Sequence, residues 1–539
     1  MTQRAMNPVS AAALLPGAAA VAWIIGLIGL PILTLAAAAP AGRIVETLGD
    51  PYVRHVAWFS LWQAALSMAL SLTLAVPVAV ALARRHRLIG VAMLLRMFNL
   101  ALVAPAMIAI LGIAAIHGRN GWVNQMLSVA GFEGSHYLYG LPGILLAHVF
   151  FNMPLATRVF LQAIESVQPE NWRLASQLGM GPWAIFRLID WPAMRRVLPS
   201  VAGVIFMLCF TSFAVVLTLG GGPWATTIEV AIYQALRLEF DIARAVTLAG
   251  VQLTACVLLS AVFLCLARSG GEILGTERRP FARPDTDHLM TRSVDTAALI
   301  LALGVVVAPL AAVLIAGING ASVAVLQDQV LWRAAARSVS VALLAGGLSL
   351  ALGLGLLHGA RMLRTEHRRV GLAGAMELIG LLPLITPPLM LAAGLFLLLR
   401  PYADVLAVGL YLTIAVNALM GLPFVLRIVA PAMRRADEET SRLCLELGIR
   451  GWDRFRLVDW PLIRGAAGLA LAIAATLAAG DMGVIALFGS QDTETLPLLL
   501  YRRMGAYQME AAAVTATMLA VVCLGLFWVL ETLVRGRGR

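Results

Sequence analysis

FRLIDWP occupies residues 186–192, and FRLVDWP occupies residues 455–461 of the same 539-residue chain. The two heptapeptides differ at one position and lie 269 residues apart. Other identical pairs at this offset include Pro154 and Pro423, Arg158 and Arg427, Gly179 and Gly448, Trp183 and Trp452, and Arg195 and Arg464. Farther out the offset drifts: Ser60 and Ser71 match Ser338 and Ser349 at 278, and 245–247 (AVT) matches 513–515 at 268. The chain therefore reads as a tandem duplication whose loops have changed in length.

The composition is that of an integral membrane protein. Hydrophobic residues make up 60% of the chain and charged residues 13%, with a mean hydropathy of +0.87, whereas soluble proteins average about half apolar and a quarter charged residues. A helix needs about 20 apolar residues to cross the bilayer core. The sequence predicts an all-α polytopic protein with twelve spans in two groups of six, at residues 14–39, 60–83, 91–116, 138–163, 197–219, 243–267, 294–317, 335–358, 371–399, 404–432, 465–488 and 509–534. Pro383, Pro387 and Pro388 predict a kink or break in the ninth.

The arginines predict the orientation of the chain. All 40 basic residues are Arg, and an N-terminus in the cytoplasm places about thirty of them on the cytoplasmic side, as the positive-inside rule expects. Six spans per half return the chain to its starting side, so both termini are expected in the cytoplasm. The predicted parts are a first transmembrane half at 1–267, a polar cytoplasmic linker at 268–293 and a second half at 294–539. The net charge of +11 then requires no nucleic-acid partner, because no soluble segment is long enough to carry a basic binding surface.

The sequence contains no pattern typical of an enzyme, a metal site or a nucleotide site. Five cysteines show neither C-x-x-C nor metal-ligand spacing and are interpreted as small buried apolar residues. No G-x-x-x-x-G-K-[ST] sequence occurs to bind the phosphates of ATP. We therefore expect no catalytic residues, metal or cofactor on this chain, and any energy from ATP has to come from a partner.

Each half has its longest predicted cytoplasmic loop between the fourth and fifth spans. In the first half, a helix over 172–178 is expected to end at Gly179, and Pro182 fits the first turn of a second short helix. Large aromatic side chains and an aspartate are expected on one face of that helix, at Trp183, Phe186 and Asp190. The second half repeats the pattern with Gly448, Trp452, Phe455 and Asp459, and Gly451 replaces Pro182.

Two interpretations of these loops remain open. An amphipathic loop could lie on lipid headgroups, anchored by Trp and Arg, and Arg195, Arg196 and Arg464 are interpreted as such interfacial anchors. A lipid anchor does not need a Gly at a fixed distance from Asp-Trp-Pro, yet both halves have one. This spacing favours a docking element for another protein.

The loop pattern resembles a known family. Arg173-Leu174-Ala175-x3-Gly179-x9-Ile189-x-Trp191-Pro192, and its counterpart from Arg442 to Pro461, look like the EAA loop of the membrane subunits of binding-protein-dependent ABC importers. In that family, the loop forms coupling helices that enter a cleft of each ATPase subunit. Arg173 and Arg442 stand where the family has Glu, so no salt bridge of that Glu is implied. The residues implied to couple to an ATPase are Arg173, Leu174, Ala175, Gly179, Trp183, Phe186, Asp190, Pro192, Arg442, Leu443, Gly448, Trp452, Phe455, Asp459 and Pro461.

A fused double permease of this length resembles the iron and thiamine branch of the family. The stretches at 139–158 (YGLPGILLAHVFFNMPLATR) and 206–236 (FMLCFTSFAVVLTLGGGPWATTIEVAIYQAL) look like the permease subunit of thiamine importers. The resemblance covers nearly the whole chain and is strongest at 137–247. It implies import of thiamine or its phosphates from the periplasm across a bacterial inner membrane. The implied partners are two copies of an ATPase subunit that binds ATP, a periplasmic binding protein and surrounding lipid.

A few residues are candidates for the substrate path. Thiamine carries a permanent positive charge, so its path should offer aromatic faces or a carboxylate. Candidate residues are Phe206, Phe210 and Phe213 in the fifth span and Asp481 in the eleventh. The alternatives are packing of the phenylalanines on a neighbouring helix and an interhelical hydrogen bond for Asp481. His148 is interpreted as a packed, hydrogen-bonded residue.

Two other transport functions compete with thiamine import. Ferric iron is the alternative substrate within the family, although an iron path should show more oxygen ligands. A proton-coupled secondary transporter can also have twelve spans in two parallel halves. It should carry several ionisable residues within the membrane, and this chain offers chiefly Asp481, with Glu377 nearer the inner face.

Overall fold

The computed structural model describes residues 8–38, 46–86, 89–131, 137–267, 283–286, 288–365, 369–449 and 451–535. Throughout these ranges, the regular structure is helical and contains no strand, as predicted. The described helices group into two compact units that do not follow chain order. Unit 1 comprises Met1–Glu46, Ile232–Leu253 and Gly320–Arg539, and unit 2 comprises Thr47–Ala231 and Thr254–Asn319.

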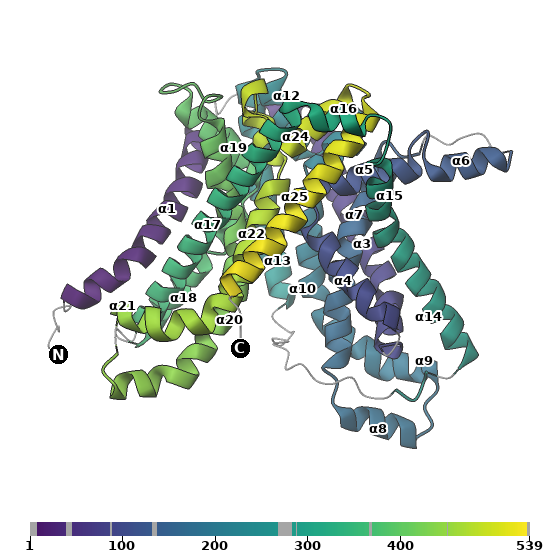
Figure 1. Ribbon diagram of the computed structural model, residues 1–539, viewed down its shortest axis with the longest axis horizontal. Coiled ribbons are helices and arrows are strands. Elements are labelled where there is room, and N and C mark those ends of the chain that lie inside the picture. Colours follow the sequence, from purple (N-terminus) through teal and green to yellow (C-terminus); the bar gives the residue numbers. More distant parts are fainter. Residues whose placement is uncertain are drawn as a thin grey trace. The chain divides into compact units, whose positions relative to one another are not determined.

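Figure 1 shows the helices of both units. Unit 2 contains α3 (Pro51–Arg84), α4 (Ile89–Val103), α5 (Ala106–His117), α6 (Trp122–Val129), α7 (Leu141–Glu165), α8 (Pro169–Gln177), α9 (Pro182–Ile185), η1 (Phe186–Asp190), α10 (Trp191–Phe210), α11 (Ala214–Leu219), η2 (Pro223–Ala225), α14 (Leu289–Ala302), η3 (Leu303–Val307) and α15 (Ala308–Ala316). Unit 1 contains α1 (Pro8–Ala38), α16 (Ser322–Gln327), α17 (Gln329–Thr365), α18 (Val370–Ile379), η4 (Leu382–Leu384), α19 (Pro388–Leu399), α20 (Gly409–Glu446), α21 (Gly451–Arg454), η5 (Phe455–Asp459), α22 (Trp460–Gly480), α23 (Gly483–Phe488), η6 (Gln491–Thr493), α24 (Leu496–Gly505) and α25 (Met509–Arg535). Residues of α12 (Ile228–Arg237) and α13 (Ile242–Ala267) belong to both units.

The described residues form eleven helices long and apolar enough to span a membrane, and one bent pair brings the number to twelve. The bent pair is Val370–Leu384 with Pro388–Leu399, at an angle of 92°. The predicted break in the ninth span is therefore confirmed. The third predicted span, 91–116, is also interrupted, because α4 ends at Val103 and α5 begins after Pro105. In both places a proline in extended conformation precedes the new helix, since proline has no N–H to continue the old one.

The first helix of each sequence half packs on helices of the other half. In unit 1, α1 lies against α17 and α19, and in unit 2, α14 lies against α3 and α15 against α5. Glycines allow these close approaches. A Cβ on Gly112 would stand 2.2 Å from the carbonyl oxygen of Pro309, and a Cβ on Gly394 would stand 2.7 Å from that of Pro31. The division at 268–293 remains a prediction about the sequence, and the compact units cut across it.

Equivalent serines in the two halves make the same tertiary contact. Ser60 in α3 accepts a hydrogen bond from the backbone N–H of Ile228 at 2.9 Å. Ser338 in α17 accepts one from the backbone N–H of Leu496, also at 2.9 Å. Each serine is buried and satisfies the first N–H of a short helix, α12 or α24. The duplication read from the sequence is thus preserved in the packing.

Candidate functional site: the loops between the fourth and fifth spans

The first loop turns sharply at Gly179. Between α7 and α10, helix α8 ends in a Schellman motif, in which the N–H of Met180 bonds to the carbonyl of Ala175 at 3.0 Å and that of Gly179 to Ser176 at 3.2 Å. Gly179 has φ +59°, a conformation that is costly for residues with a Cβ. The expected helix end at Gly179 and the new start at Pro182 are confirmed, because α8 ends at Gln177 with Leu178 as its C-cap and α9 begins at Pro182. Figure 1 shows the two short helices α8 and α9.

In the second loop, the helix ends with the same kind of turn as in the first, but it is not separated from the preceding span. The N–H of Ile449 bonds to the carbonyl of Cys444 at 2.9 Å, and Gly448 has φ +68°. The expected separate short helix is wrong here, because α20 continues without a break from the fourth span to Glu446. In the first loop, Pro169 interrupts the helix, and the equivalent residue in α20 is Glu438, which can donate its N–H.

The repeated heptapeptides form identical wide turns. Phe186–Asp190 and Phe455–Asp459 are each one π-helical turn that leads directly into the fifth span of their half. The extra residue of a π turn changes the phase of the helix. As a result Asp190 is fully buried while Trp183 is largely exposed, so the expectation that they share a face is wrong. Asp459 is buried in the same way.

Each loop exposes apolar side chains at equivalent positions. Exposed in both loops are Leu174 and Leu443, Leu178 and Leu447, and Leu188 and Leu457. Trp183 is also exposed and stacks on Phe186 at 5.6 Å, whereas the side chain of Trp452 lies outside the described part of the structure. The adjacent Arg173 and Arg442 are exposed, whereas Ala175 is buried. Both loops therefore present a mixed apolar and basic surface.

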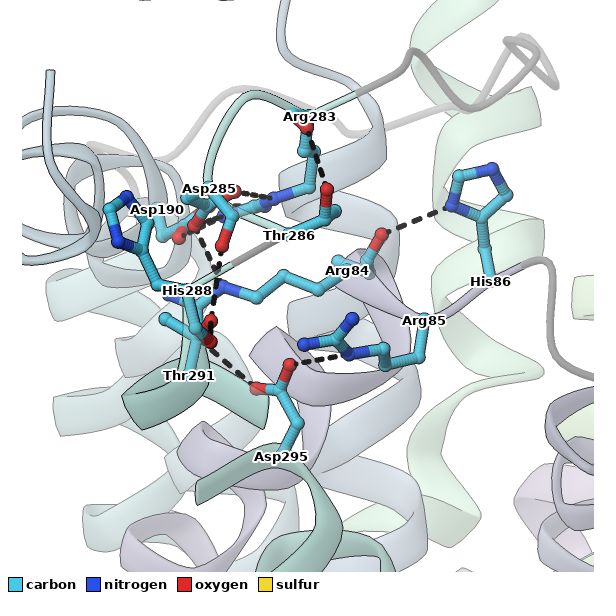
Figure 2. A network of polar contacts seen from close by, with 11 residues as sticks. Arg84, Arg85, His86, Asp190, Arg283, Asp285, Thr286, His288, Thr291 and Asp295 are labelled. Atoms are coloured by element: carbon cyan, nitrogen blue, oxygen red, sulfur yellow. Dashed lines mark hydrogen bonds and ion pairs between the residues drawn. The ribbon is translucent and has the colours of Figure 1, made fainter. Parts of the chain in front are cut away.

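A cluster of three arginines and three aspartates lies beside the first loop (Figure 2). Its members are Arg84, Arg85, Asp190, Arg283, Asp285 and Asp295. Arg283 donates two parallel hydrogen bonds to Asp190, Nη1 to Oδ1 at 2.9 Å and Nη2 to Oδ2 at 2.8 Å. Its guanidinium also bonds both carboxylate oxygens of Asp285 and lies 4.4 Å from the ring centre of Trp172. The cluster is neutral as a whole, which suits its burial.

The C-terminal end of α3 contributes two arginines to this cluster. Arg84 donates to Asp285 at 2.7 Å and to Asp295 at 3.1 Å, and Arg85 donates to Asp295 at 2.9 Å. Burial alone would raise the pKa of Asp285, but the hydrogen bonds and charges of Arg283 and Arg84 outweigh it and lower that pKa below its ordinary value. Asp285 therefore carries its charge at neutral pH and pairs with both arginines.

The second loop has a smaller cluster in unit 1. Arg361, near the end of α17, donates to Asp459 at 2.7 Å and forms an ion pair with Asp437 at 3.0 Å. Arg454 donates to Asp437 at 2.7 Å and lies 3.6 Å from Asp459. Two arginines and two aspartates thus neutralise one another. In both loops the aspartate of the heptapeptide faces this internal cluster.

The arginines that hold these aspartates are not evident from the sequence. Arg84 and Arg361 lie near the ends of apolar spans, where an arginine is normally interpreted as an interfacial anchor. Arg283 lies in a polar segment that reads as a solvated linker. The pairing of charges distant in sequence becomes visible only when the helices are packed.

Comparison with known proteins identifies the family of the chain. No family model matches the sequence. The chain is 42% identical over 521 residues to the thiamine transport system permease protein ThiP of Escherichia coli (strain K12), and the match covers 96% of each chain. It is 41% identical to ThiP of Brucella abortus (strain 2308), covering 96% of this chain and 94% of the relative. The chain belongs to the thiamine transport system permease family.

Membership in the thiamine permease family confirms the resemblance read from the loops. Members are permease subunits, which are translocation components rather than enzymes. Together with the spans, this makes the chain a multi-pass protein of the inner membrane. A shorter match, 29% identical over 169 residues, relates 31% of this chain to 26% of the putative ferric transport system permease protein FbpB 1 of Haemophilus influenzae. The family relationship therefore favours thiamine over iron.

In this member of the thiamine permease family, the predicted substrate-path residues are mostly packed. Phe206, Phe210 and Phe213 are buried, and Phe206 stacks on Phe210 at 6.1 Å. Asp481 is half-buried and caps the first turn of α23, accepting from the N–H of Gly483 at 3.2 Å and of Val484 at 3.3 Å. These contacts provide a structural reason for each residue, and their role in the substrate path stays a prediction.

His148 is packed and hydrogen-bonded, as predicted. Its ring is buried in unit 2, and Nδ1 lies 2.8 Å from the hydroxyl of Ser67. This contact joins α7 to α3 and explains a histidine among apolar residues.

Proposed function

We propose that this chain is the transmembrane permease of an ATP-driven importer that moves thiamine or its phosphates from the periplasm to the cytoplasm. The observation that carries the proposal is the match over 96% of the chain to a protein named a thiamine transport system permease. The duplicated loops, with equivalent exposed leucines, add an independent physical reason. Two equivalent surfaces on one chain suit two copies of the same motor subunit.

The loops are proposed to couple transport to ATP hydrolysis on the partner. Leu174, Leu178 and Trp183 of the first loop are exposed and available for docking. Asp190 and Asp459 are proposed to act differently, because their carboxylates point into the charge clusters and hold the loops in position. We propose that the loops and both termini lie in the cytoplasm, because the positive-inside rule then holds for most of the arginines, and that the binding protein docks on the opposite side of the membrane.

The composition of the complex provides a direct test. One copy of this chain is expected to purify with two ATPase subunits and, when loaded with thiamine, to bind one periplasmic binding protein. Mass measurement of the purified complex checks the stoichiometry. Two copies of this chain in one complex would contradict the proposal.

Ferric iron is the second candidate substrate, because of the shorter match to a ferric permease. Proteoliposomes that contain the complex are expected to take up labelled thiamine only when ATP is present. Uptake of iron without uptake of thiamine would overturn the substrate. Uptake driven by a proton gradient without ATP would instead indicate a secondary transporter.

Replacing Asp481 by Asn is expected to slow thiamine uptake without preventing assembly. Asn retains an oxygen that can cap α23, but it lacks the charge that would favour a cation in a low-dielectric path. The measurements are uptake of labelled thiamine and basal ATP hydrolysis by the purified complex. Normal uptake by the Asp481→Asn protein at normal expression would assign Asp481 to helix packing instead, through the cap on α23 and a hydrogen bond to Asn417.

A further inference from the structure

The first loop lacks two charged groups that the second loop supplies for itself. In unit 1, Arg454 and Asp437 belong to the loop and to the end of the helix that enters it, and they pair with each other at 2.7 Å. The equivalent positions, 269 residues earlier, hold Ile185 and Gln168, which carry no charge. The first loop nevertheless has the same buried heptapeptide aspartate to neutralise.

The segment at 283–286 supplies these groups in unit 2. Arg283 pairs with the heptapeptide aspartate, Asp190, and also with a second carboxylate, Asp285. Asp285 in turn bonds Arg84 at the end of the second span. In both units, one arginine pairs with the heptapeptide aspartate and with a second carboxylate, and that carboxylate also pairs with a second arginine. The arginine of the span differs, because Arg361 bonds the heptapeptide aspartate of its loop whereas Arg84 bonds Asp285 and Asp295.

Both guanidinium groups also contact the same position of their loop helices. Arg454 donates to the hydroxyl of Ser441 at 3.2 Å. The position equivalent to Ser441 is Trp172, and the guanidinium of Arg283 lies 4.4 Å from its ring centre. A stacked aromatic ring in unit 2 thus takes the place of a hydroxyl in unit 1, and a cation over an indole ring is a favourable contact.

We propose that Arg283 and Asp285 position the first loop, as Arg454 and Asp437 position the second. Without Arg283, the fully buried carboxylate of Asp190 loses both of its charge-assisted hydrogen bonds. An uncompensated buried charge is strongly destabilising, so the loop leaves its packed position. Arg283 and Asp285, which lie between the two sequence halves, are therefore structural parts of the first loop, and the two loops depend on different residues.

Cysteine labelling tests this proposal without any partner protein. Ala175 and Cys444 are equivalent residues with 1% and 2% of their surface exposed, so a thiol at each position reports opening of its own loop. In the Ala175→Cys protein, Arg283→Gln is expected to speed maleimide labelling at position 175 by at least about tenfold and to leave Cys444 unchanged. Arg454→Gln is expected to speed labelling of Cys444 and to leave the rate at position 175 unchanged. Peptide mass spectrometry separates the labelled sites.

Arg292→Gln serves as the matched control, because Arg292 is an exposed arginine on the helix that follows the segment. It should leave both labelling rates unchanged. Arg283→Lys retains the charge but not the paired hydrogen bonds, so it should give an intermediate rate at position 175. If Arg283→Gln speeds labelling in both loops equally, or in neither, the proposal is overturned.

Transfer of the arginine gives a second test. Arg283→Gln combined with Ile185→Arg places a guanidinium where the second loop has Arg454, and it should recover slow labelling at position 175 in part. If Ile185→Arg alone slows labelling but the combined protein labels as fast as Arg283→Gln, the two positions are not equivalent and the proposal fails.

The consequence for transport rests on the proposed function. With Arg283→Gln, uptake of labelled thiamine per ATP hydrolysed is expected to fall severalfold, whereas Arg292→Gln should behave as the unmutated protein. The proposed substrate and the proposed positioning role can be disproved independently. If the unmutated complex takes up no thiamine, the proposed substrate is wrong while the labelling result still stands. If Arg283→Gln does not change labelling, the positioning role is wrong whatever the substrate.

Discussion

Replacing Arg361 with Gln is expected to lower the free energy of unfolding by about 3–5 kcal/mol, the usual cost of removing one partner from a buried ion pair. Arg361 is buried and contacts two carboxylates, Asp459 at 2.7 Å and Asp437 at 3.0 Å. Glutamine cannot neutralise either charge. Loss of this arginine leaves Arg454 as the remaining cation of the cluster for two aspartates, and the second loop should lose its fixed position.

Unfolding of the purified protein by sodium dodecyl sulfate in mixed micelles measures this effect. The matched control is Arg364→Gln, on the same helix, where the arginine side chain is 34% exposed and pairs with Glu377. That substitution should cost at most about 1 kcal/mol, because solvent screens a partly exposed pair. An equal loss of unfolding free energy in both proteins would show that the buried pairs of Arg361 contribute no more to stability than the partly exposed pair of Arg364.

Replacing Gly448 or Gly179 with Val is expected to reduce coupling of transport to ATP hydrolysis by about tenfold. Both glycines have left-handed backbone conformations, with φ +68° and +59°. The cost for a residue with a Cβ is about 1–2 kcal/mol, and about 1.4 kcal/mol is a factor of ten. Apart from the adjacent residues of the chain, no heavy atom lies within 4 Å of the place of a Cβ at either position, so the effect comes from the backbone and not from a clash.

The first loop offers a matched control two residues away. Gly181 also has open space for a Cβ, but its φ is −71°, which other residues adopt readily. Gly181→Val should therefore retain most of the coupling, and Gly179→Asn should retain more than Gly179→Val because Asn tolerates the left-handed region. Stimulation of ATP hydrolysis by loaded binding protein measures coupling. Normal stimulation in both Val variants would show that the turn geometry is not needed.

Local sequence patterns predicted the membrane spans, the two loop turns and the break in the ninth span. Apolar segments of sufficient length gave the spans, because a helix satisfies its own backbone hydrogen bonds in the bilayer. Gly179 and Gly448 predicted the turns, since the Schellman motif needs a left-handed residue. The prolines near 387 predicted the break that the structure shows at 92°. All of these signals act within a few residues of the chain.

The sequence alone determined the helical membrane fold, the duplication and the position of both loops, because these depend on local patterns. Only the tertiary structure decided that the first helix of each half packs with the other half, that α20 continues into its loop, and that Asp190 faces inward. The pairing of Arg283 with Asp190 is the clearest case, since 93 residues separate them. An arginine in a polar segment looks the same in a sequence whether it is solvated or buried, and its partner is set by how the helices pack.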